Sequence, residues 1–334
     1  MRAVLVKQPG GAEQLEIGEV QKPALDEVNT LLIRIKATAL NRADIHQREG
    51  KYPPPPGASE VLGLETAGIV EEVSEAAAAE GWKKGDRICA LLPGGGYAEY
   101  CAIPHGMAIR IPDGMPFEEA ASLPEAFLTA WQALCWQGDL QDNKRVLIHA
   151  GASGVGTAAI QLAKQFANTT VIVTAGSDEK IEFCQSVVGA DHGINYKQCD
   201  GRFAERVLEL TEGKGVDILI DFVGASYWEE NLRCLACDGV MVMLAFLGGT
   251  AAPAFDLSPF LRKRITVRGS TLRARPVEYK TKLTKELAAF LLPRLADGRI
   301  KAVISKVFDW KDVAAAHGFM EDNRNLGKIV LTGM

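Results

Sequence analysis

A glycine-rich turn between two apolar stretches constrains this chain more than any other feature. The turn is His149–Gly156, with the sequence HAGASGVG. Residues 146–148 before it are apolar without alternation, which is typical of a strand covered on both faces of a parallel sheet. After it, apolar residues recur every three or four positions from Val155 to Phe166, which predicts a helix. This order is typical of a turn that holds a pyrophosphate at a helix N-terminus.

The turn departs from the usual dinucleotide fingerprint at one position. Counting from Gly151, the middle glycine of G-x-G-x-x-G is replaced by Ser153. A glycine turn can also be a simple connector between a strand and a helix. The flanking pattern favours dinucleotide binding over that interpretation, but the choice needs support from the rest of the chain.

The pattern downstream of the turn indicates a complete nucleotide-binding sheet. From about residue 125, helical segments alternate with short buried strands, which predicts an α/β fold with a doubly wound parallel sheet. Six strands are expected, the number in a Rossmann sheet. They lie at Arg145–Ile148, Val171–Thr174, Gly193–Tyr196, Val216–Gly224, Gly239–Leu244 and Ile265–Ser270.

The remaining segments indicate a second, β-rich region and a mixed tail. Residues 1 to about 124 hold several short β patterns separated by glycine, proline and charged turns. The tail should contain helices near Leu283–Asp297 and Trp310–Asp322 and a final strand at Lys328–Leu331. A chain of 334 residues is long enough for two domains with separate cores.

Composition excludes several classes of function. With 47% hydrophobic and 24% charged residues, the chain is typical of soluble globular proteins. Its formal net charge of −5 gives no reason to expect a nucleic acid partner. No apolar run is long enough to cross a membrane. Its 7 scattered cysteines do not resemble a disulfide framework, so we expect a cytoplasmic location.

The end of the second predicted strand should select the cofactor. An acidic residue about twenty positions after the glycines would bind the ribose of NAD, but residues 174–177 offer no carboxylate. Asp178 lies just after these residues and is expected to stabilise the start of the next helix. Lys180 can reach a 2′-phosphate, and Ser177 can hydrogen-bond it. Although Lys180 alone could be a solvated surface charge, this strand end favours NADPH.

With these features in place, the chain resembles the zinc-independent quinone oxidoreductases of the medium-chain dehydrogenase/reductase superfamily. The resemblance covers essentially the whole length and is closest to the tumour-suppressor-inducible branch, in which Ser153 is a regular feature. The motifs that carry it are Ala39–Asp44, Gly63–Gly68, Leu92–Tyr100, Pro124–Ala130, His149–Gly156, Ile194–Lys197 and Asn325–Leu331.

The resemblance implies a domain organisation and the absence of a metal. It implies a GroES-like catalytic domain at 1–124, a Rossmann NADPH-binding domain at 125–270 and a tail, 271–334, that returns to the catalytic domain. Zinc members of the superfamily place cysteine, histidine and cysteine where this chain has Asn41, Leu64 and Glu125. The four-cysteine structural zinc lobe is also missing. Asparagine and leucine cannot replace a thiolate and an imidazole, so no metal should bind.

The resemblance also implies the residues of the site. Asn41 and Tyr52 are expected near the nicotinamide and the acceptor, where Tyr52 either donates a hydrogen bond to a developing quinol oxygen or only shapes the pocket. Asp44 and Glu65 are expected to hold loops. The implied cofactor-binding residues are Asn41, Thr129, Ser153, Gly154, Val155, Gly156, Ser177, Lys180, Tyr196, Phe222, Val223, Gly224, Phe246, Leu247, Ser270, Thr271, Leu272, Asn325 and Lys328.

These expectations lead to three hypotheses about function. The first is an NADPH-dependent reductase of small or medium quinones, since a zinc-free site suits acceptors that take a hydride readily. The second is an enone or enoyl double-bond reductase, with the same cofactor and a different pocket. The third is a catalytically weak NADPH-binding protein with an RNA-binding or structural role. The resemblance further implies a homodimer that pairs the last Rossmann strand, at Ile265–Ser270.

Overall fold

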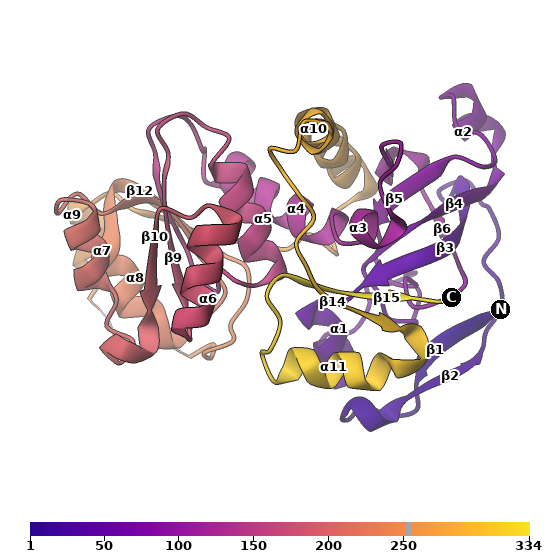
Figure 1. The fold of residues 1–334 in the computed structure, drawn as a ribbon, viewed down its shortest axis with the longest axis horizontal. Helices are drawn as coiled ribbons and strands as arrows, with labels where there is room; N and C mark the ends of the chain where they lie inside the picture. The colour runs from indigo at the N-terminus through magenta and orange to yellow at the C-terminus, as the bar shows by residue number, and fades with distance from the viewer. Residues whose placement is uncertain (252–255) are drawn as a thin grey trace. The chain divides into compact units, whose positions relative to one another are not determined.

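The structure is a computed structural model that describes residues 1–251 and 256–334 (Figure 1). The chain forms two compact units, one of residues 1–128 and 272–334 and the other of residues 129–271. The second unit is therefore inserted into the first along the chain. The domain boundaries expected from the sequence, after residues 124 and 270, stay a prediction.

The inserted unit is built on a parallel sheet of six strands. The strands are β8 (Arg145–Ile148), β9 (Thr170–Ala175), β10 (His192–Asn195), β11 (Val216–Asp221), β12 (Leu235–Met243) and β13 (Thr266–Gly269). Their spatial order is β10-β9-β8-β11-β12-β13, which is the Rossmann order 3-2-1-4-5-6. All five neighbouring pairs are parallel. The predicted fold class is confirmed, because each strand lies where the buried apolar runs indicate it.

Short helices connect these strands and bury their apolar faces against the sheet. They are α5 (Gly154–Ala163), α6 (Asp178–Phe183), α7 (Ala204–Leu210), α8 (Trp228–Cys234) and α9 (Ser258–Arg262). The core between sheet and helices contains Leu147, Ile172, Phe203 and Leu219, all 0% exposed. His149 is also fully buried, where its Nε2–H donates to Asn231 Oδ1 at 2.7 Å and its Nδ1 shares a hydrogen bond with the hydroxyl of Thr174 at 2.8 Å. These hydrogen bonds attach the start of the glycine turn to β9 and α8.

The first unit is a mostly antiparallel β structure that the tail of the chain completes. Its strands are β1 (Arg2–Val6), β2 (Leu15–Glu19), β3 (Leu31–Ala39), β4 (Glu65–Val73), β5 (Arg87–Leu91), β6 (Tyr100–Ile103), β7 (Ala108–Arg110), β14 (Ile304–Asp309) and β15 (Lys328–Thr332). The main sheet has the order β14-β15-β3-β4-β5-β7, and β6 also pairs with β3. Antiparallel pairing of β15 with β3 joins the end of the chain to its first third.

Helices of the first unit cover this sheet and hold its connections. They are α1 (Arg42–Arg48), α2 (Glu75–Ala79), α3 (Phe117–Ala121), α10 (Val277–Ala296) and α11 (Val313–Glu321), and α4 (Pro124–Trp131) crosses the boundary between the units. The predicted tail helix at Leu283–Asp297 begins six residues earlier, at Val277. Within the described ranges, no helix combines the length and the apolar character needed to cross a bilayer.

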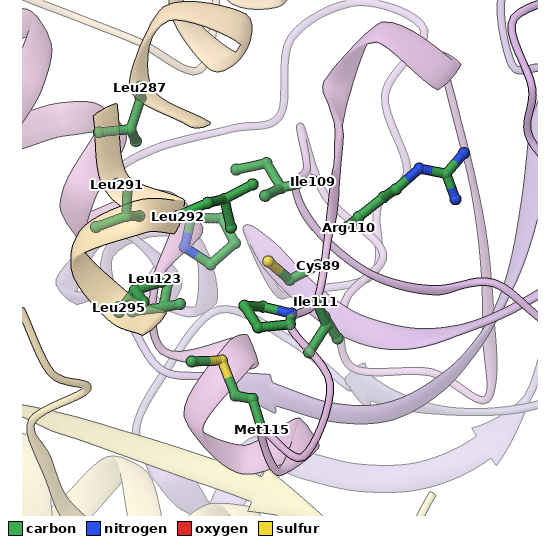
Figure 2. A pocket seen from close by; sticks show the side chains of 12 residues that line it. Cys89, Ile109, Arg110, Ile111, Met115, Leu123, Leu287, Leu291, Leu292 and Leu295 are labelled. Carbon is green, nitrogen blue, oxygen red and sulfur yellow. The ribbon is translucent and has the colours of Figure 1, made fainter. Parts of the chain in front are cut away.

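A small apolar cavity lies where α10 packs on the sheet of the first unit (Figure 2). Four leucines of α10 line it on one side, and residues of β5, β7 and the following loop line the other. Its volume is about 10 Å³, about the space of one water molecule. The lining surface is apolar, so the cavity is a packing gap and not a substrate site. The lining residues include Cys89, Ile109, Ile111, Met115, Leu287, Leu291, Leu292 and Leu295.

Replacement of Leu291 by alanine should destabilise the first unit, because it enlarges this gap. Leu291 is 1% exposed, and a buried leucine truncated to alanine costs about 2–5 kcal/mol. Leu261→Ala, at a side chain that is 85% exposed, should cost less than about 0.5 kcal/mol. Denaturant unfolding monitored by circular dichroism measures both. Equal losses would show that Leu291 does not support the core.

Candidate active site

The glycine turn forms the N-terminus of α5. Ser153 is the N-cap residue, and its Oγ accepts the N–H of Gly156 at 3.0 Å. The first N–H groups of a helix have no partner within the helix, so those of Gly154 and Val155 face outward at the cap. These groups and the helix dipole favour an anion at this point. Ser153 therefore serves the turn as a cap.

The turn also leaves no space for larger side chains where glycine stands. A Cβ atom on Gly151 would lie 2.7 Å from Cβ of Val173, and one on Gly156 would lie 2.4 Å from the carbonyl oxygen of Ala150. Ala150 itself has a φ of 49°, in the left-handed region that alanine rarely adopts. Strain of this kind persists where the surrounding structure holds the backbone in place. The residues present therefore fit the pyrophosphate of a dinucleotide.

The end of β9 suits a 2′-phosphate because residues 174–177 carry no carboxylate. Ser177 caps α6, and its Oγ accepts the N–H of Lys180 at 3.3 Å. Asp178 is the first acid after this strand end, and its carboxylate accepts hydrogen bonds from Asn195 Nδ2 at 2.8 Å and Gln198 Nε2 at 2.9 Å. Asp178 is thus engaged within the protein.

Tyr196 lies beside the end of β9 because residue 176 is glycine. A Cβ atom at Gly176 would be 2.7 Å from the Tyr196 hydroxyl and 3.5 Å from Cε of Lys197. Lys180 is half-buried on α6, and Lys197 is exposed. The structure therefore gathers a hydroxyl and a second cation at the place where Lys180 is predicted to act. Lys197 belongs to the motif Ile194–Lys197, but no periodic pattern in the sequence distinguishes its side chain.

Other predicted cofactor residues follow the carboxyl ends of the strands. Val223 and Gly224 come after β11, and their N–H groups donate to the buried carboxylate of Asp221 at 2.8 Å and 3.1 Å. Phe246 and Leu247, after β12, are 53% and 54% exposed, and Phe222 O accepts the Leu247 N–H at 3.0 Å. Apolar side chains this exposed at strand ends are available to a ligand.

Three further predicted residues of the inserted unit differ in their bonding. Ser270 Oγ accepts a hydrogen bond from Gln137 Nε2 at 2.9 Å, and the carbonyl of Thr271 accepts one from Gln132 Nε2 at 3.3 Å. The Oγ1 of Thr129 is buried without a hydrogen-bond partner. An unpaired buried hydroxyl is costly, and a ligand group could satisfy it.

In the first unit, Asn41 and Lys328 meet in a buried polar cluster. The Lys328 ammonium donates to Asn41 Oδ1 at 2.7 Å, Glu65 Oε1 at 2.6 Å and the carbonyl of Leu40 at 2.8 Å. Asn41 Nδ2 donates to the same Glu65 oxygen at 2.9 Å. Lys328 and Glu65 are 5% and 0% exposed. We call Asn41, Glu65 and Lys328 the lysine cluster.

Asp44 links the lysine cluster to α1 and the neighbouring loop. Its Oδ2 accepts the N–H of Asn41 at 2.7 Å, and its Oδ1 accepts the N–H of Gly63 at 3.1 Å. Burial raises the pKa of Asp44 to about 6, although these N–H groups and Lys328 oppose the shift. Asp44 and Glu65 thus hold backbone and side chains by hydrogen bonds.

Tyr52 lies next to a buried arginine. The guanidinium of Arg273 is stacked 5.3 Å from the centre of the Tyr52 ring. Arg273 is 5% exposed and donates to Pro93 O and Gln47 Oε1, both at 2.7 Å, while its Nη1 is buried without a partner. Burial raises the pKa of Tyr52, which remains a neutral hydrogen-bond donor near pH 7.

Glu125 adds a second carboxyl beside Glu65. It is half-buried in the first turn of α4, and its N–H donates to Glu65 Oε2 at 2.9 Å. The sequence marks Glu125 only as a position where zinc relatives carry cysteine. Its proximity to Glu65 could not be read from the chain, because the two residues are separated by 60 positions.

The predicted site residues thus divide between the two units. Asn41, Tyr52, Leu272, Asn325 and Lys328 belong to the first unit, and the others belong to the inserted unit. Asn325 Nδ2 donates to the carbonyl of Gly327 at 2.9 Å, which stabilises the turn before β15. The structure brings Lys328 and Asn41 together and does not show an ammonium of Lys328 left for a cofactor phosphate. Its assignment as a cofactor ligand stays a prediction.

The residues at the zinc positions of relatives do not fit zinc. Leu64 is 1% exposed and has no ligating atom, and the amide of Asn41 is already bonded to Glu65 and Lys328. Tetrahedral zinc sites require thiolate, imidazole or carboxylate ligands in place of these groups. The Lys328 ammonium supplies a positive charge to this cluster instead.

Two family models match the chain, one in each part of the fold. The model for the alcohol dehydrogenase GroES-like domain matches residues 27–113, and the model for the zinc-binding dehydrogenase matches residues 154–289. A curated relative is a component of the phenolphthiocerol/phthiocerol polyketide synthase of Mycobacterium tuberculosis, which is 30% identical over 98% of this chain. The chain spans only 14% of the length of that synthase component.

Solved structures match over nearly the whole chain. The quinone oxidoreductase of Pseudomonas syringae pv. Tomato DC3000 is 30% identical, with 99% of each chain covered and a TM-score of 0.85. A mycobacterial protein solved in complex with NADPH is 28% identical, with both chains fully covered and a TM-score of 0.88. The CurK enoyl reductase is 28% identical, with 99% and 98% covered and a TM-score of 0.85. The chain therefore belongs to the medium-chain dehydrogenase/reductase superfamily and, within it, to the zinc-independent quinone oxidoreductase subfamily.

Proposed function

We propose that this oxidoreductase is an NADPH-dependent, zinc-independent reductase of small or medium quinones. The observation that carries the proposal is the lysine cluster, in which Asn41, at one of the zinc positions of relatives, is bonded to an ammonium and a carboxylate that are also bonded to each other. Such a site offers no Lewis acid to polarise an unreactive carbonyl. Quinones accept reducing equivalents without that help, because their reduction restores an aromatic ring.

The inserted unit would hold the cofactor. The N-terminus of α5 would bind the pyrophosphate, and Ser177, Lys180 and Tyr196 would surround the 2′-phosphate at the end of β9. When bound, NADPH supplies the two electrons and the hydrogen that reduce the acceptor. Support comes from the NADPH found in the mycobacterial relative and from the engagement of Asp178 by Asn195 and Gln198.

The first unit would position and polarise the acceptor. Tyr52 is a neutral phenol beside Arg273, so its hydroxyl can donate to an oxygen that gains negative charge. The unpaired Nη1 of Arg273 offers a further donor for such an oxygen. Asn41 is bonded on both amide atoms and would act by shaping the site.

A double-bond reductase is the second candidate function. The CurK enoyl reductase covers nearly the whole chain, and the polyketide synthase relative matches along 98% of it. An enone takes a hydride at carbon and a proton at the neighbouring carbon, so the same donors would serve it. A protein that binds NADPH without turnover, in an RNA-binding or structural role, is the third.

We also propose a homodimer formed through β13. This strand is at the end of the parallel sheet, and Thr266, Arg268 and Gly269 are exposed on it. An exposed edge strand can pair with a second copy and is thereby protected. The prediction from the sequence, Ile265–Ser270, includes this strand.

An acceptor screen on chelator-treated protein tests the proposed function. NADPH oxidation should be rapid with ortho-quinones or para-quinones, weaker with alkenals, and unchanged by removal of divalent metals, because the residues present do not ligate zinc. Faster turnover of enoyl substrates would favour the second candidate. Tight NADPH binding without turnover of any acceptor would favour the third, and loss of activity with the chelator would contradict a metal-free site.

Replacement of Lys180 by alanine should weaken NADPH binding selectively. Loss of one charge-assisted contact to the 2′-phosphate should raise the Kd of NADPH by about 10- to 100-fold, while the Kd of NADH changes little. Nicotinamide fluorescence measures both constants. Lys214→Ala is the matched control in the same unit, because Lys214 pairs with Glu212 at the surface. An equal loss for both cofactors would remove the phosphate assignment.

Replacement of Tyr52 by phenylalanine should lower turnover more than cofactor affinity. If the hydroxyl donates to the acceptor oxygen, its loss should reduce kcat by about 10-fold and leave the Kd of NADPH nearly unchanged. Steady-state kinetics and fluorescence titration separate the two effects. Tyr100→Phe, on β6, is the control for loss of a phenol hydroxyl. Unchanged kcat would leave Tyr52 as a wall of the pocket.

A further inference from the structure

Two carboxyl groups of the first unit lie together in very different surroundings. Glu65, on β4, is fully buried, and both of its oxygens are bonded. Oε1 accepts from Lys328 Nζ at 2.6 Å and from Asn41 Nδ2 at 2.9 Å, and Oε2 accepts the N–H of Glu125 at 2.9 Å. Glu65 is therefore held in place by hydrogen bonds from an ammonium, an amide and a backbone N–H.

The carboxyl of Glu125 has no such partners. Its backbone is tied to Glu65, but across residues 1–251 and 256–334 its own carboxyl oxygens make no hydrogen bond or ion pair. The side chain is half-buried, and its oxygens are not among the fully enclosed polar atoms. The backbone of Glu125 is thus fixed in α4, whereas its carboxyl remains open to solvent or to a bound molecule.

Charged groups from four elements surround Glu125. Glu65 on β4 and Asp44 on α1 disfavour its ionisation, while Lys328 on β15 and Arg273 favour it. Tyr52 is also close enough to interact electrostatically with Glu125, and so is Lys280 on α10. Burial and Glu65 prevail over the cations and raise the pKa of Glu125 to about 8. At pH 7 the group therefore holds its proton.

A pair of acids with opposed surroundings is the usual arrangement for a proton donor beside a fixed charge. Reduction of a quinone or an enone by a hydride leaves an anion that needs one proton. Tyr52 is a poor source of it, because burial raises the already high pKa of its phenol. The cation Lys328 is enclosed by its three partners, which are the Leu40 carbonyl, Asn41 and Glu65. Glu125 has a proton, an unengaged carboxyl and access.

We propose that Glu125 is the proton donor of the reaction and a catalytic residue of the acceptor site. The inference rests on the proposed reductase function. NADPH delivers a hydrogen and two electrons to the acceptor, and the O–H bond of the Glu125 carboxyl breaks as the proton passes to the resulting anion. The products are NADP⁺, the reduced acceptor and the Glu125 carboxylate. A proton from solvent then restores the acid.

The proposal also accounts for the energetic cost of a Glu125 carboxyl that makes no hydrogen bond. A half-buried acid whose carboxyl makes no hydrogen bond does not stabilise a fold, and groups of this kind are concentrated at functional sites. Glu65 holds the first turn of α4 through the Glu125 N–H and, by its charge, keeps the proton on the carboxyl. Glu65 is a positioning residue in this arrangement, and the lysine cluster keeps it in place.

Replacement of Glu125 by glutamine tests the proposal. The isosteric amide cannot give up a proton, so kcat for the best quinone should fall by about 100-fold or more, while the Kd of NADPH stays within about twofold. In the unchanged protein, kcat should decrease above about pH 8 as Glu125 ionises, and this decrease should be absent in Glu125→Gln. Glu125→Asp should restore part of the rate and the pH dependence. Glu80→Gln, at an exposed glutamate of the same unit, is the matched control.

Stability measurements show separately whether the variant folds and whether the acid titrates. The pKa of Glu125 is about 8 in the folded chain and near 4.5 when unfolded, so the folded state binds more protons between these values. The unfolding free energy of the unchanged protein should therefore decrease as the pH rises through this range, and Glu125→Gln should lack this contribution. Loss of cooperative unfolding in Glu125→Gln would leave Glu125→Asp as the deciding variant.

The outcomes separate this inference from the proposed function. Absence of turnover in the unchanged protein would defeat the proposed function itself. Turnover in the unchanged protein with full activity and an unaltered pH profile in Glu125→Gln would overturn the role of Glu125 and leave the function intact. A folded Glu125→Asp protein whose rate and pH profile match those of Glu125→Gln would also overturn it, because the shortened acid still carries a proton.

Discussion

The buried ion pair between Lys328 and Glu65 organises the first unit. It joins β15, near the end of the chain, to β4 and, through Asn41, to the start of α1. Removing two charges from water costs several kcal/mol each, and their attraction repays this only when further hydrogen bonds complete the geometry. Asn41, the Leu40 carbonyl and the Glu125 N–H supply those bonds. The pair therefore makes the polar interior of the site dependent on the returning tail.

Most of the fold follows from local patterns in the sequence. Apolar runs of four to nine residues predict the strands of the inserted unit, and the glycine turn places its phosphate-binding helix, because both depend on neighbours in the chain. The acid-free end of β9 is also readable, since it requires only the absence of a carboxylate at residues 174–177. The sequence does not show how Gly176 makes room for Tyr196, because that contact spans two strands.

The candidate acceptor site is less predictable because its contacts are long-range. Lys328 and Glu65 are separated by 263 positions, and the resemblance assigns Lys328 to the cofactor, whereas the structure encloses its ammonium in the lysine cluster. Arg273 follows the last Rossmann strand without a periodic pattern, and only its stacking on Tyr52 sets it apart. In the sequence, Glu125 stands out only because zinc relatives carry a cysteine at this position. Its role depends on which charges surround it, and no local rule supplies them.

The lysine cluster also explains how loss of a metal can be compatible with acid chemistry. A zinc ion raises the reactivity of a carbonyl and lowers the pKa of its other ligands, so an acid beside it would ionise. An ammonium satisfied by three oxygens gives a weaker field at Glu125, where burial and the Glu65 charge dominate. Replacement of the zinc ligands therefore removes the Lewis acid and also allows the Glu125 carboxyl to keep its proton at neutral pH. Such a site suits acceptors that need a proton more than they need polarisation of a carbonyl. Quinones and enones share this chemistry.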